Sequence, residues 1–381
     1  MINKLTIKNF KIHKSLTLDL SNLTILAGQN SSGKSAILQA LLLLRQSYIQ
    51  GRIYESLQLQ GDLCNIGLVD DAICEYADDD TIEFTLQTEE KTVQWQYAIP
   101  DNNGFKDMIP IVSPDRNMVD FEDAMRLFGK KFHYISAARK GPQESYPLNT
   151  ATVEINNQLS TKLGECDLVA HYLHYYGVEN NTVVNEALRF DDIESPYLIP
   201  QVSAWERLVS AGVNVNVQKE GKSFVMKYSY TKKGDFVASK EYSATNVGYG
   251  LSYALPIIVA LLTAEPNSLL LIENPEIHLH PQGQSALAQL IARAAQMGAQ
   301  IIIETHSDHI INGVLKATKL FENGKKGIDK NLTRIYQCKK DEETQLSLME
   351  PIRIIGDGKI DRQPDDFFDQ IDKDLEFLMG F

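Results

Sequence analysis

Residues 28–35 hold the glycines and polar side chains that a phosphate-binding loop requires. They read GQNSSGKS, which fits the pattern G-x-x-x-x-G-K-[ST] in full, between a short apolar run and a long apolar stretch of helical character. Gly28 and Gly33 let successive backbone N–H groups turn toward phosphate oxygens. In such a loop Lys34 reaches the β- and γ-phosphates, and the Ser35 hydroxyl is a Mg2+ ligand. The segment predicts a site for a nucleoside triphosphate with Mg2+.

The start of the following helix, expected over 34–50, adds positive potential to this loop. Unpaired N–H groups and the helix dipole both favour an anion there. We therefore expect eight consecutive or nearly consecutive positions to bind the nucleotide: Gly28, Asn30, Ser31, Ser32, Gly33, Lys34, Ser35 and Ala36.

A second apolar run, at 269–272, leads directly into acidic residues. A buried carboxylate is costly unless it meets a cation, so Glu273 is a candidate Mg2+ ligand beside Ser35. Asn274 and Glu276 follow at once and are candidate catalytic residues, together with Glu273 itself.

His306 is the fourth candidate catalytic residue. It follows another apolar run, 301–303, and so lies just past the end of a predicted buried strand. Ligands of α/β proteins bind at this carboxyl edge of the sheet. A capping or packing histidine is the alternative interpretation.

A second glycine-rich turn precedes a predicted helix at about 250–264. Glycines and a serine at a helix start form another anion-binding end. The residues expected to contact nucleotide there are Asn246, Gly248, Gly250 and Ser252. One triphosphate rarely needs two such ends, so this turn is best explained as completing the site of a second copy.

The elements that must position these residues change along the chain. The first 27 residues alternate as strands do, and strands alternate with helices in the final third, which predicts a parallel sheet with crossovers. No Pro/Gly/Ser linker divides the chain, so we expect one domain in three parts. Residues 1–60 form a β-lobe with the phosphate loop, 61–240 an inserted lobe, and 241–381 the remaining motifs with a closing helix at 365–378.

Composition narrows the class of protein. With 381 residues, 43% apolar and 23% charged, the chain is not a disordered one. Thirty-seven basic against 50 acidic residues give a net charge of −13, so nucleic acid would need a local basic patch. The dense cluster is Lys4, Lys8, Lys11, His13 and Lys14. Four scattered cysteines and no apolar run near the ~20 residues of a membrane span predict a cytoplasmic protein without a membrane segment.

These motifs resemble those of the ABC-type ATPase heads of RecF, structural-maintenance-of-chromosomes (SMC) and overcoming-lysogenization-defect (OLD) proteins. Within that group the chain is similar to a bacterial AAA ATPase family that is often found near phage-defence genes. The matching segments are LTIKNFK at 5–11, the Walker A loop at 28–35, VGYGLS at 247–252 as a degenerate signature, IENPEIHLHP at 272–281 as Walker B with D-loop, and ETHS at 304–307 as the switch-histidine segment.

The resemblance implies a fold, a cofactor and a partner. The fold would be an α/β P-loop NTPase with a mostly parallel central sheet, an ABC-type head with an N-terminal antiparallel β-lobe and an inserted mixed α+β lobe. Two copies would hold each ATP, with Mg2+, between one Walker A loop and the other copy's signature, and His306 would sense the γ-phosphate. Asn274 stands where these heads place the glutamate that activates water. An amide cannot accept that proton, so we expect slow hydrolysis, with Glu276 as a candidate substitute base.

Two functions follow from the resemblance. The first is an ATP-switched homodimer that regulates or scaffolds a separate effector protein, in anti-phage defence. The alternative is a RecF-like, DNA-binding ATPase in repair or recombination. Arg139 could reach a phosphate or a partner, or form a surface ion pair. Gln46, Gln58 and Gln60 are equal candidates for the glutamine that touches magnesium in ABC heads.

Overall fold

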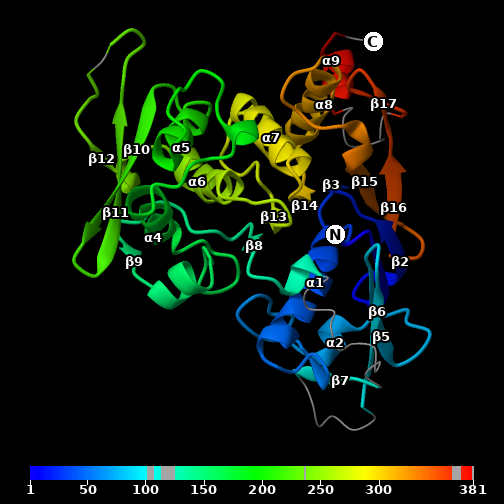
Figure 1. Cartoon of the computed structure of the whole chain (residues 1–381). Helices are drawn as coiled ribbons and strands as arrows, with labels where there is room; N and C mark the ends of the chain where they lie inside the picture. Colours follow the sequence, from blue (N-terminus) through cyan, green and yellow to red (C-terminus); the bar gives the residue numbers. More distant parts are fainter. Residues whose placement is uncertain (101–106, 113–124, 236, 363–369, 380–381) are drawn as a thin grey trace.

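A six-stranded sheet forms the centre of the protein in the computed structural model, which describes residues 1–100, 107–112, 125–235, 237–362 and 370–379 (Figure 1). The strand order is β16-β15-β3-β14-β13-β8. From β15 to β8 the neighbours run parallel, and β16 is antiparallel at one edge. The strands are β16 (Ser347–Ile352), β15 (Thr333–Lys340), β3 (Leu23–Gly28), β14 (Gln300–Thr305), β13 (Leu269–Glu273) and β8 (Phe132–Ile135). The predicted mostly parallel α/β sheet is confirmed.

Both faces of this sheet are covered, which explains the unbroken apolar runs of its strands. In β13, Leu269 and Leu271 pack into one core, whereas Leu270 and Ile272 pack into the other, because side chains alternate along a strand. Helix α1 (Lys34–Ile49) covers the first face. The second face is covered by helices α4 (Val169–His174), α5 (Leu198–Glu206), α6 (Tyr249–Leu262), α7 (Pro281–Gln296) and α8 (Asp308–Glu322).

An antiparallel sheet of order β2-β1-β5-β6 packs on the side of α1. Its strands are β1 (Lys4–Phe10), β2 (His13–Asp19), β5 (Thr81–Gln87) and β6 (Thr92–Ala98). The antiparallel N-terminal lobe is therefore present. Two of its strands come from 81–98, so the expected division at residue 60 cuts through this sheet. Nearby lie the short α2 (Val69–Ala72) and the pair β4 (Ser56–Gln58) and β7 (Met108–Pro110).

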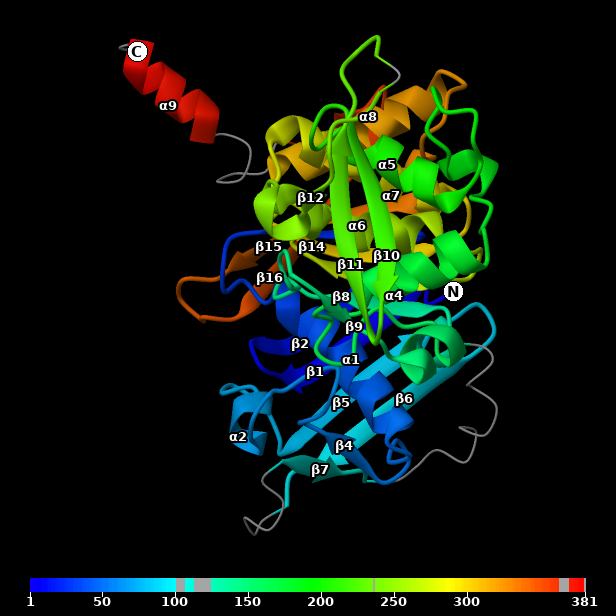
Figure 2. The same cartoon turned by 90° about the vertical axis from the view of Figure 1, so that its left-hand side faces the viewer.

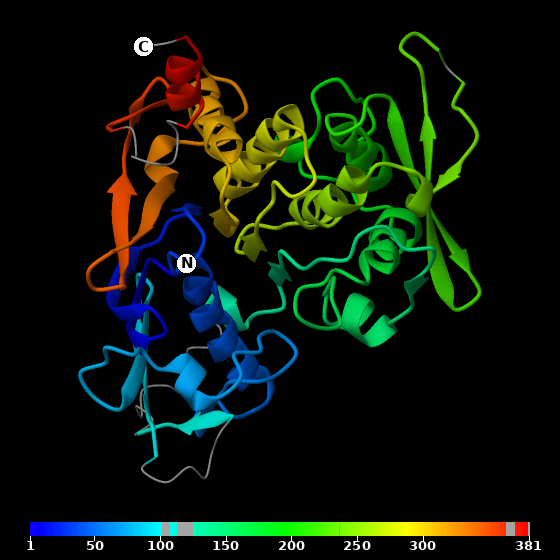
Figure 3. The same cartoon turned by 180° about the vertical axis from the view of Figure 1, so that it is seen from behind.

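The inserted lobe carries a third, antiparallel sheet, drawn in green at the opposite end of the molecule from β15 and β16 (Figures 1 and 3). Its strands are β9 (Tyr146–Pro147), β10 (Val213–Glu220), β11 (Ser223–Tyr230) and β12 (Tyr242–Ser243). The chain passes from β12 through a single 3-10 turn, Ala244–Asn246, to α6. The lobe therefore leads directly into the second glycine-rich turn.

The expected closing helix forms, as α9 (Gln370–Met379), but it does not pack as one. Figure 2 shows it apart from the body, after the hairpin β17 (Ile354–Gly356) and β18 (Lys359–Ile360). Phe377 and Leu378 are 84% and 77% exposed. Helical spacing predicts an apolar stripe but does not specify the surface that covers it. Residues 365–369 of the predicted helix lie outside the described residues.

No helix within the described ranges is both long and apolar enough to cross a bilayer.

Candidate functional site

The phosphate loop joins β3 to α1, and its backbone is one that only glycine fits at two positions. Gly28 has φ +144°, and a Cβ there would lie 2.1 Å from the carbonyl oxygen of Cys338 in the neighbouring β15. Gly33 has φ +97°, and its Cβ would lie 2.8 Å from the ring of His13. A side chain at Gly28 would displace the backbone of β15, and one at Gly33 would displace the His13 and Ile12 side chains, so both glycines are structural requirements of the loop.

Lys34 is folded back over this loop. Its ammonium is buried and donates to the carbonyl oxygens of Gly28, at 3.0 Å, and Gln29, at 2.6 Å. Burial lowers the pKa of Lys34, and the nearby carboxylates of Glu304 and Glu276 oppose that shift. The ammonium therefore lies where the phosphate oxygens of a bound nucleotide would compete with these carbonyl oxygens for its hydrogen bonds.

A cavity of about 300 Å3 opens above the loop. It is lined by the predicted residues Asn30, Ser31, Ser32, Gly33, Lys34, Ser35 and Ala36, and also by Lys11, Ile12, Gln39, Glu304 and His306. The sequence missed Lys11 and Gln39 as residues of this site. The Lys11 ammonium donates to Gln39 Oε1 at 2.7 Å, which places a positive charge at the cavity margin. These two side chains are far apart in the sequence, and only the packing of the turn after β1 beside α1 brings them together.

Glu304, rather than Glu273, is the carboxylate that meets Ser35. The Ser35 hydroxyl donates to Glu304 Oε1 at 2.8 Å, and the other oxygen of this buried glutamate has no hydrogen-bond partner. Glu273 instead accepts from the Tyr134 hydroxyl at 2.9 Å and the Ala137 N–H at 3.0 Å. Its two oxygens are thereby turned toward Tyr134 in β8 and Ala137 just after it, and the role of Glu273 as a Mg2+ ligand stays a prediction.

Strand register explains why both glutamates lie near the loop. Glu273 and Glu304 are paired across β13 and β14, and β14 lies between β13 and the loop strand β3. Burial raises the pKa of Glu304 to about 7. A hydroxyl and a buried carboxylate oxygen without a partner form a donor set that suits Mg2+, which prefers oxygen ligands. Ser35 and Glu304 therefore fit this ion, with Glu273 on the next strand.

The other candidate catalytic residues lie at the same sheet edge. Glu276 accepts from the Thr305 hydroxyl at 2.8 Å and from the His306 N–H at 2.7 Å, so it supports the histidine segment. Burial and the Lys34 ammonium lower the pKa of His306, which leaves its imidazole neutral at pH 7. Asn274 has φ +42°, and its side-chain oxygen is buried without a partner. Asparagine tolerates this left-handed conformation better than glutamate does.

The second glycine-rich turn lies elsewhere, since none of its residues lines the loop cavity. Asn246 and Gly248 are exposed, and a Cβ at Gly248 would meet nothing within 4 Å. A Cβ at Gly250 would lie 2.7 Å from the carbonyl oxygen of His278, so this glycine packs on the loop after β13. Ser252 is 4% exposed, on the buried side of α6, which corrects the expectation that it reaches a nucleotide.

The N-terminal basic cluster is not a free positive patch. Lys4, Lys8 and Lys14 lie 3.5, 3.0 and 2.5 Å from the carboxylates of Asp19, Glu83 and Asp78 respectively. His13 is 1% exposed, and burial lowers its pKa. The charges that suggested DNA contact are therefore largely neutralised by neighbours.

Two sets of weaker candidates have structural roles. Gln46 accepts from the N–H groups of Leu63 and Cys64 and lies outside the cavity, as do Gln58 and Gln60. Arg139 is buried and bonds to carbonyl oxygens, so it is neither a surface ion pair nor a phosphate ligand.

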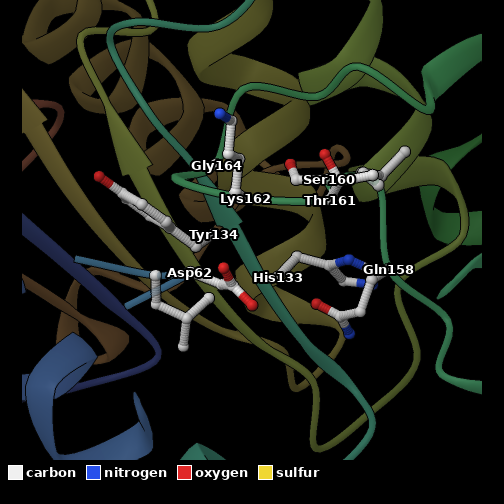
Figure 4. A pocket seen from close by; sticks show the side chains of 10 residues that line it. Asp62, His133, Tyr134, Gln158, Ser160, Thr161, Lys162 and Gly164 are labelled. Carbon is white, nitrogen blue, oxygen red and sulfur yellow. The ribbon is translucent and has the colours of Figure 1, made fainter. Parts of the chain in front are cut away.

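A second pocket, shown in Figure 4, lies beside β8 and is lined by His133, Tyr134, Gln158 and Gly164 among others. Its volume is about 30 Å3, which matches a single water molecule. It therefore does not compete with the loop cavity as a ligand site.

A glycine loop with a buried lysine, at the carboxyl edge of a mostly parallel sheet, defines a P-loop nucleoside triphosphatase. The chain belongs to the family described as the AAA ATPase domain, whose model matches residues 1–166 and 203–311. A second model, described as a protein of unknown function (DUF3696), matches residues 328–378.

Comparison with known proteins gives a more specific class. Endonuclease GajA of Bacillus cereus (strain HuB5-5) is 24% identical over 243 residues, which cover 58% of this chain and 31% of that protein. The matched part thus spans less than a third of the relative.

Solved structures resemble the whole fold. An SMC head bound to the C-winged helix domain of ScpA has a TM-score of 0.51 at 13% identity, covering 93% of this chain and 98% of that one. An SMC head with an extended coiled coil, bound to the C-terminal domain of ScpA derived from Pyrococcus furiosus, has a TM-score of 0.50 at 13% identity, covering 100% and 98%. The predicted resemblance is confirmed in these terms: the chain is an ATP-hydrolysing enzyme of the AAA ATPase family, its fold resembles that of SMC heads, and its sequence is similar to part of GajA.

Proposed function

We propose that ATP joins two copies of this chain face to face and that the resulting dimer controls a separate effector protein. The observation that carries the proposal is that the phosphate loop and the exposed, glycine-rich start of α6 lie apart within one chain. The loop cavity holds Lys34, Ser35 and His306, while the exposed helix start at Gly248 faces solvent with open space before it. A nucleotide in the loop cavity of one copy could therefore be covered by the glycine-rich helix start of the other copy.

Within one copy, the loop residues bind and orient the nucleotide. The Lys34 ammonium donates hydrogen bonds to the Gly28 and Gln29 carbonyl oxygens. With ATP bound it would donate to phosphate oxygens instead, because hydrogen bonds to a charged acceptor are stronger than those to a neutral carbonyl. Ser35 and Glu304 would hold Mg2+, which supplies charge neutralisation of the phosphates. Glu276 keeps the His306 segment at the cavity wall, where the histidine would report the γ-phosphate.

Hydrolysis is proposed to be slow. Asn274 cannot accept a proton from water, and both oxygens of Glu276 already accept hydrogen bonds from Thr305 and His306. A dimer closed by ATP would therefore persist, as a regulatory switch requires.

A role in anti-phage defence and a separate effector rest on the resemblance to defence-associated ATPases and on the GajA match. That relative is named an endonuclease, and only 31% of its length is matched here. The RecF-like alternative is less favoured, since Lys4, Lys8 and Lys14 are paired with acids and the net charge is −13.

We expect the mass in solution to double when ATP and Mg2+ are added. Sedimentation velocity of the purified chain should show a monomer without nucleotide and a dimer with ATP. Because hydrolysis is slow, the dimer should persist throughout the measurement. ADP should not give the dimer, because it lacks the γ-phosphate that the second copy would contact. A monomer at all ATP concentrations that saturate the loop would contradict the proposal.

A further inference from the structure

Arg139 joins three segments of the chain that the nucleotide site and the second glycine-rich turn both depend on. Its guanidinium is 2% exposed and makes four hydrogen bonds, all to backbone carbonyl oxygens. Nη1 donates to Ser136 and Glu273, both at 3.0 Å, and Nη2 donates to Asn274 at 2.9 Å. Nε donates to Tyr253 at 3.0 Å.

The three segments have different tasks. Ser136 belongs to the segment after β8, whose Ala137 N–H also holds the Glu273 carboxylate. Glu273 is the last residue of β13 and Asn274 follows it, at the carboxyl edge of the sheet where the proposed nucleotide site lies. Tyr253 lies in the first turns of α6, the helix whose exposed start carries Gly248.

Two further contacts fasten the same elements. The His278 ring, in the loop after β13, lies 4.5 Å from the Tyr253 ring, and the Arg139 guanidinium lies 5.6 Å from the centroid of the same Tyr253 ring. Gly250 allows the backbone of α6 to approach the His278 carbonyl closely. Because protein interiors are closely packed, we expect the end of β13 and the start of α6 to move together.

We propose that Arg139 is a positioning residue that couples ATP binding in one copy to the presentation of the same copy's glycine-rich turn to its partner. This inference rests on the proposed ATP-driven dimer. A shift of the Glu273–Asn274 backbone on ATP binding moves the guanidinium, and the guanidinium carries the Tyr253 carbonyl and α6 with it. Lysine cannot replace it, because a single ammonium cannot span three segments as a planar fork of five donors does.

The chain contains a matched control. Arg45 is also a buried arginine that donates to two carbonyl oxygens, those of Leu127 and Gly129, and it stacks over Phe132 at 4.1 Å. It joins α1 to β8 and to the segment before it, and its hydrogen bonds go to Leu127 and Gly129 rather than to β13 or α6. Loss of either fork should lower stability, but only Arg139 should affect coupling.

The test compares Arg139→Lys with Arg45→Lys. Arg139→Lys should bind a fluorescent ATP analogue within about threefold of the unsubstituted chain, yet dimerise about tenfold or more weakly with ATP, a coupling of ordinary allosteric size. Arg45→Lys should lower the thermal unfolding midpoint comparably and leave dimerisation unchanged. Equal dimerisation by Arg139→Lys and the unsubstituted chain, or equal losses in both variants, would overturn the inference.

A second measurement keeps the inference testable if Arg139→Lys does not fold. In a monomeric Gly248→Glu variant, ATP should slow amide hydrogen exchange at 28–36 and also alter it at 249–253. An ATP effect confined to 28–36 overturns the coupling. If instead the unsubstituted chain stays monomeric with ATP, the dimer itself is refuted, whereas this exchange experiment still reports separately on the coupling between the phosphate loop and the start of α6.

Discussion

Gly248→Glu should abolish the ATP-driven dimer and lower ATP hydrolysis by about 100-fold or more. Gly248 is exposed, its φ of −61° suits any residue, and a Cβ there meets nothing within 4 Å. The fold should accept the glutamate with a change in unfolding free energy below about 0.5 kcal/mol. In the proposed dimer, however, its carboxylate would face the partner's triphosphate. Two like charges 4 Å apart near a protein surface repel by about 4 kcal/mol, which exceeds a 100-fold effect.

Sedimentation velocity with ATP and a steady-state phosphate-release assay measure this result. Gly248→Gln is the matched control, because it adds a side chain of the same reach without charge and should dimerise nearly normally. Gly250 is a poor choice, since its Cβ would strike the His278 carbonyl within the same copy. Normal dimerisation of a folded Gly248→Glu chain would show that this turn does not face a nucleotide.

Lys34→Ala should weaken ATP binding by about 100-fold or more, because it removes the buried cation that would bind the phosphates. A hydrogen bond to a charged group contributes roughly 3 kcal/mol in such a site. The cost to the fold should be small. The ammonium donates to the Gly28 and Gln29 carbonyls and to the Ser32 hydroxyl beside an open cavity, and water can replace it there.

Calorimetric titration with a slowly hydrolysed ATP analogue tests this prediction. Lys11→Ala is the control: its ammonium lies at the cavity margin on Gln39, so its loss should weaken binding by only a few-fold. Comparable effects of the two variants would mean that Lys34 has no special place at the phosphates.

The sequence alone predicted those features of the fold and the site that depend on residues close together in the chain. Gly28, Gly33 and Lys34 define the loop by spacing alone, and the apolar runs at 269–272 and 301–303 identify strands that are buried on both faces. The exposed start of α6 at Gly248 was likewise marked by a local pattern of glycines.

What the sequence could not supply depends on register between distant segments. Glu304 meets Ser35 because β14 lies between β3 and β13, an order that no local pattern specifies. Glu273 turns toward Tyr134 for the same reason. Arg139 resembled a surface residue until packing placed it among the carbonyls of three segments. Helix α9 was predicted within its described residues, but helical spacing says nothing about what covers the helix.

Because a composite site takes its two halves from different copies, a mixture of two inactive variants tests the account most directly. Lys34→Ala retains an intact helix start, and Gly248→Glu retains an intact loop. Each should be nearly inactive alone, whereas an equimolar mixture should recover up to about a quarter of the unsubstituted ATP hydrolysis, because half of randomly formed pairs hold one intact site of two. A mixture no more active than its two components measured apart would contradict the shared site.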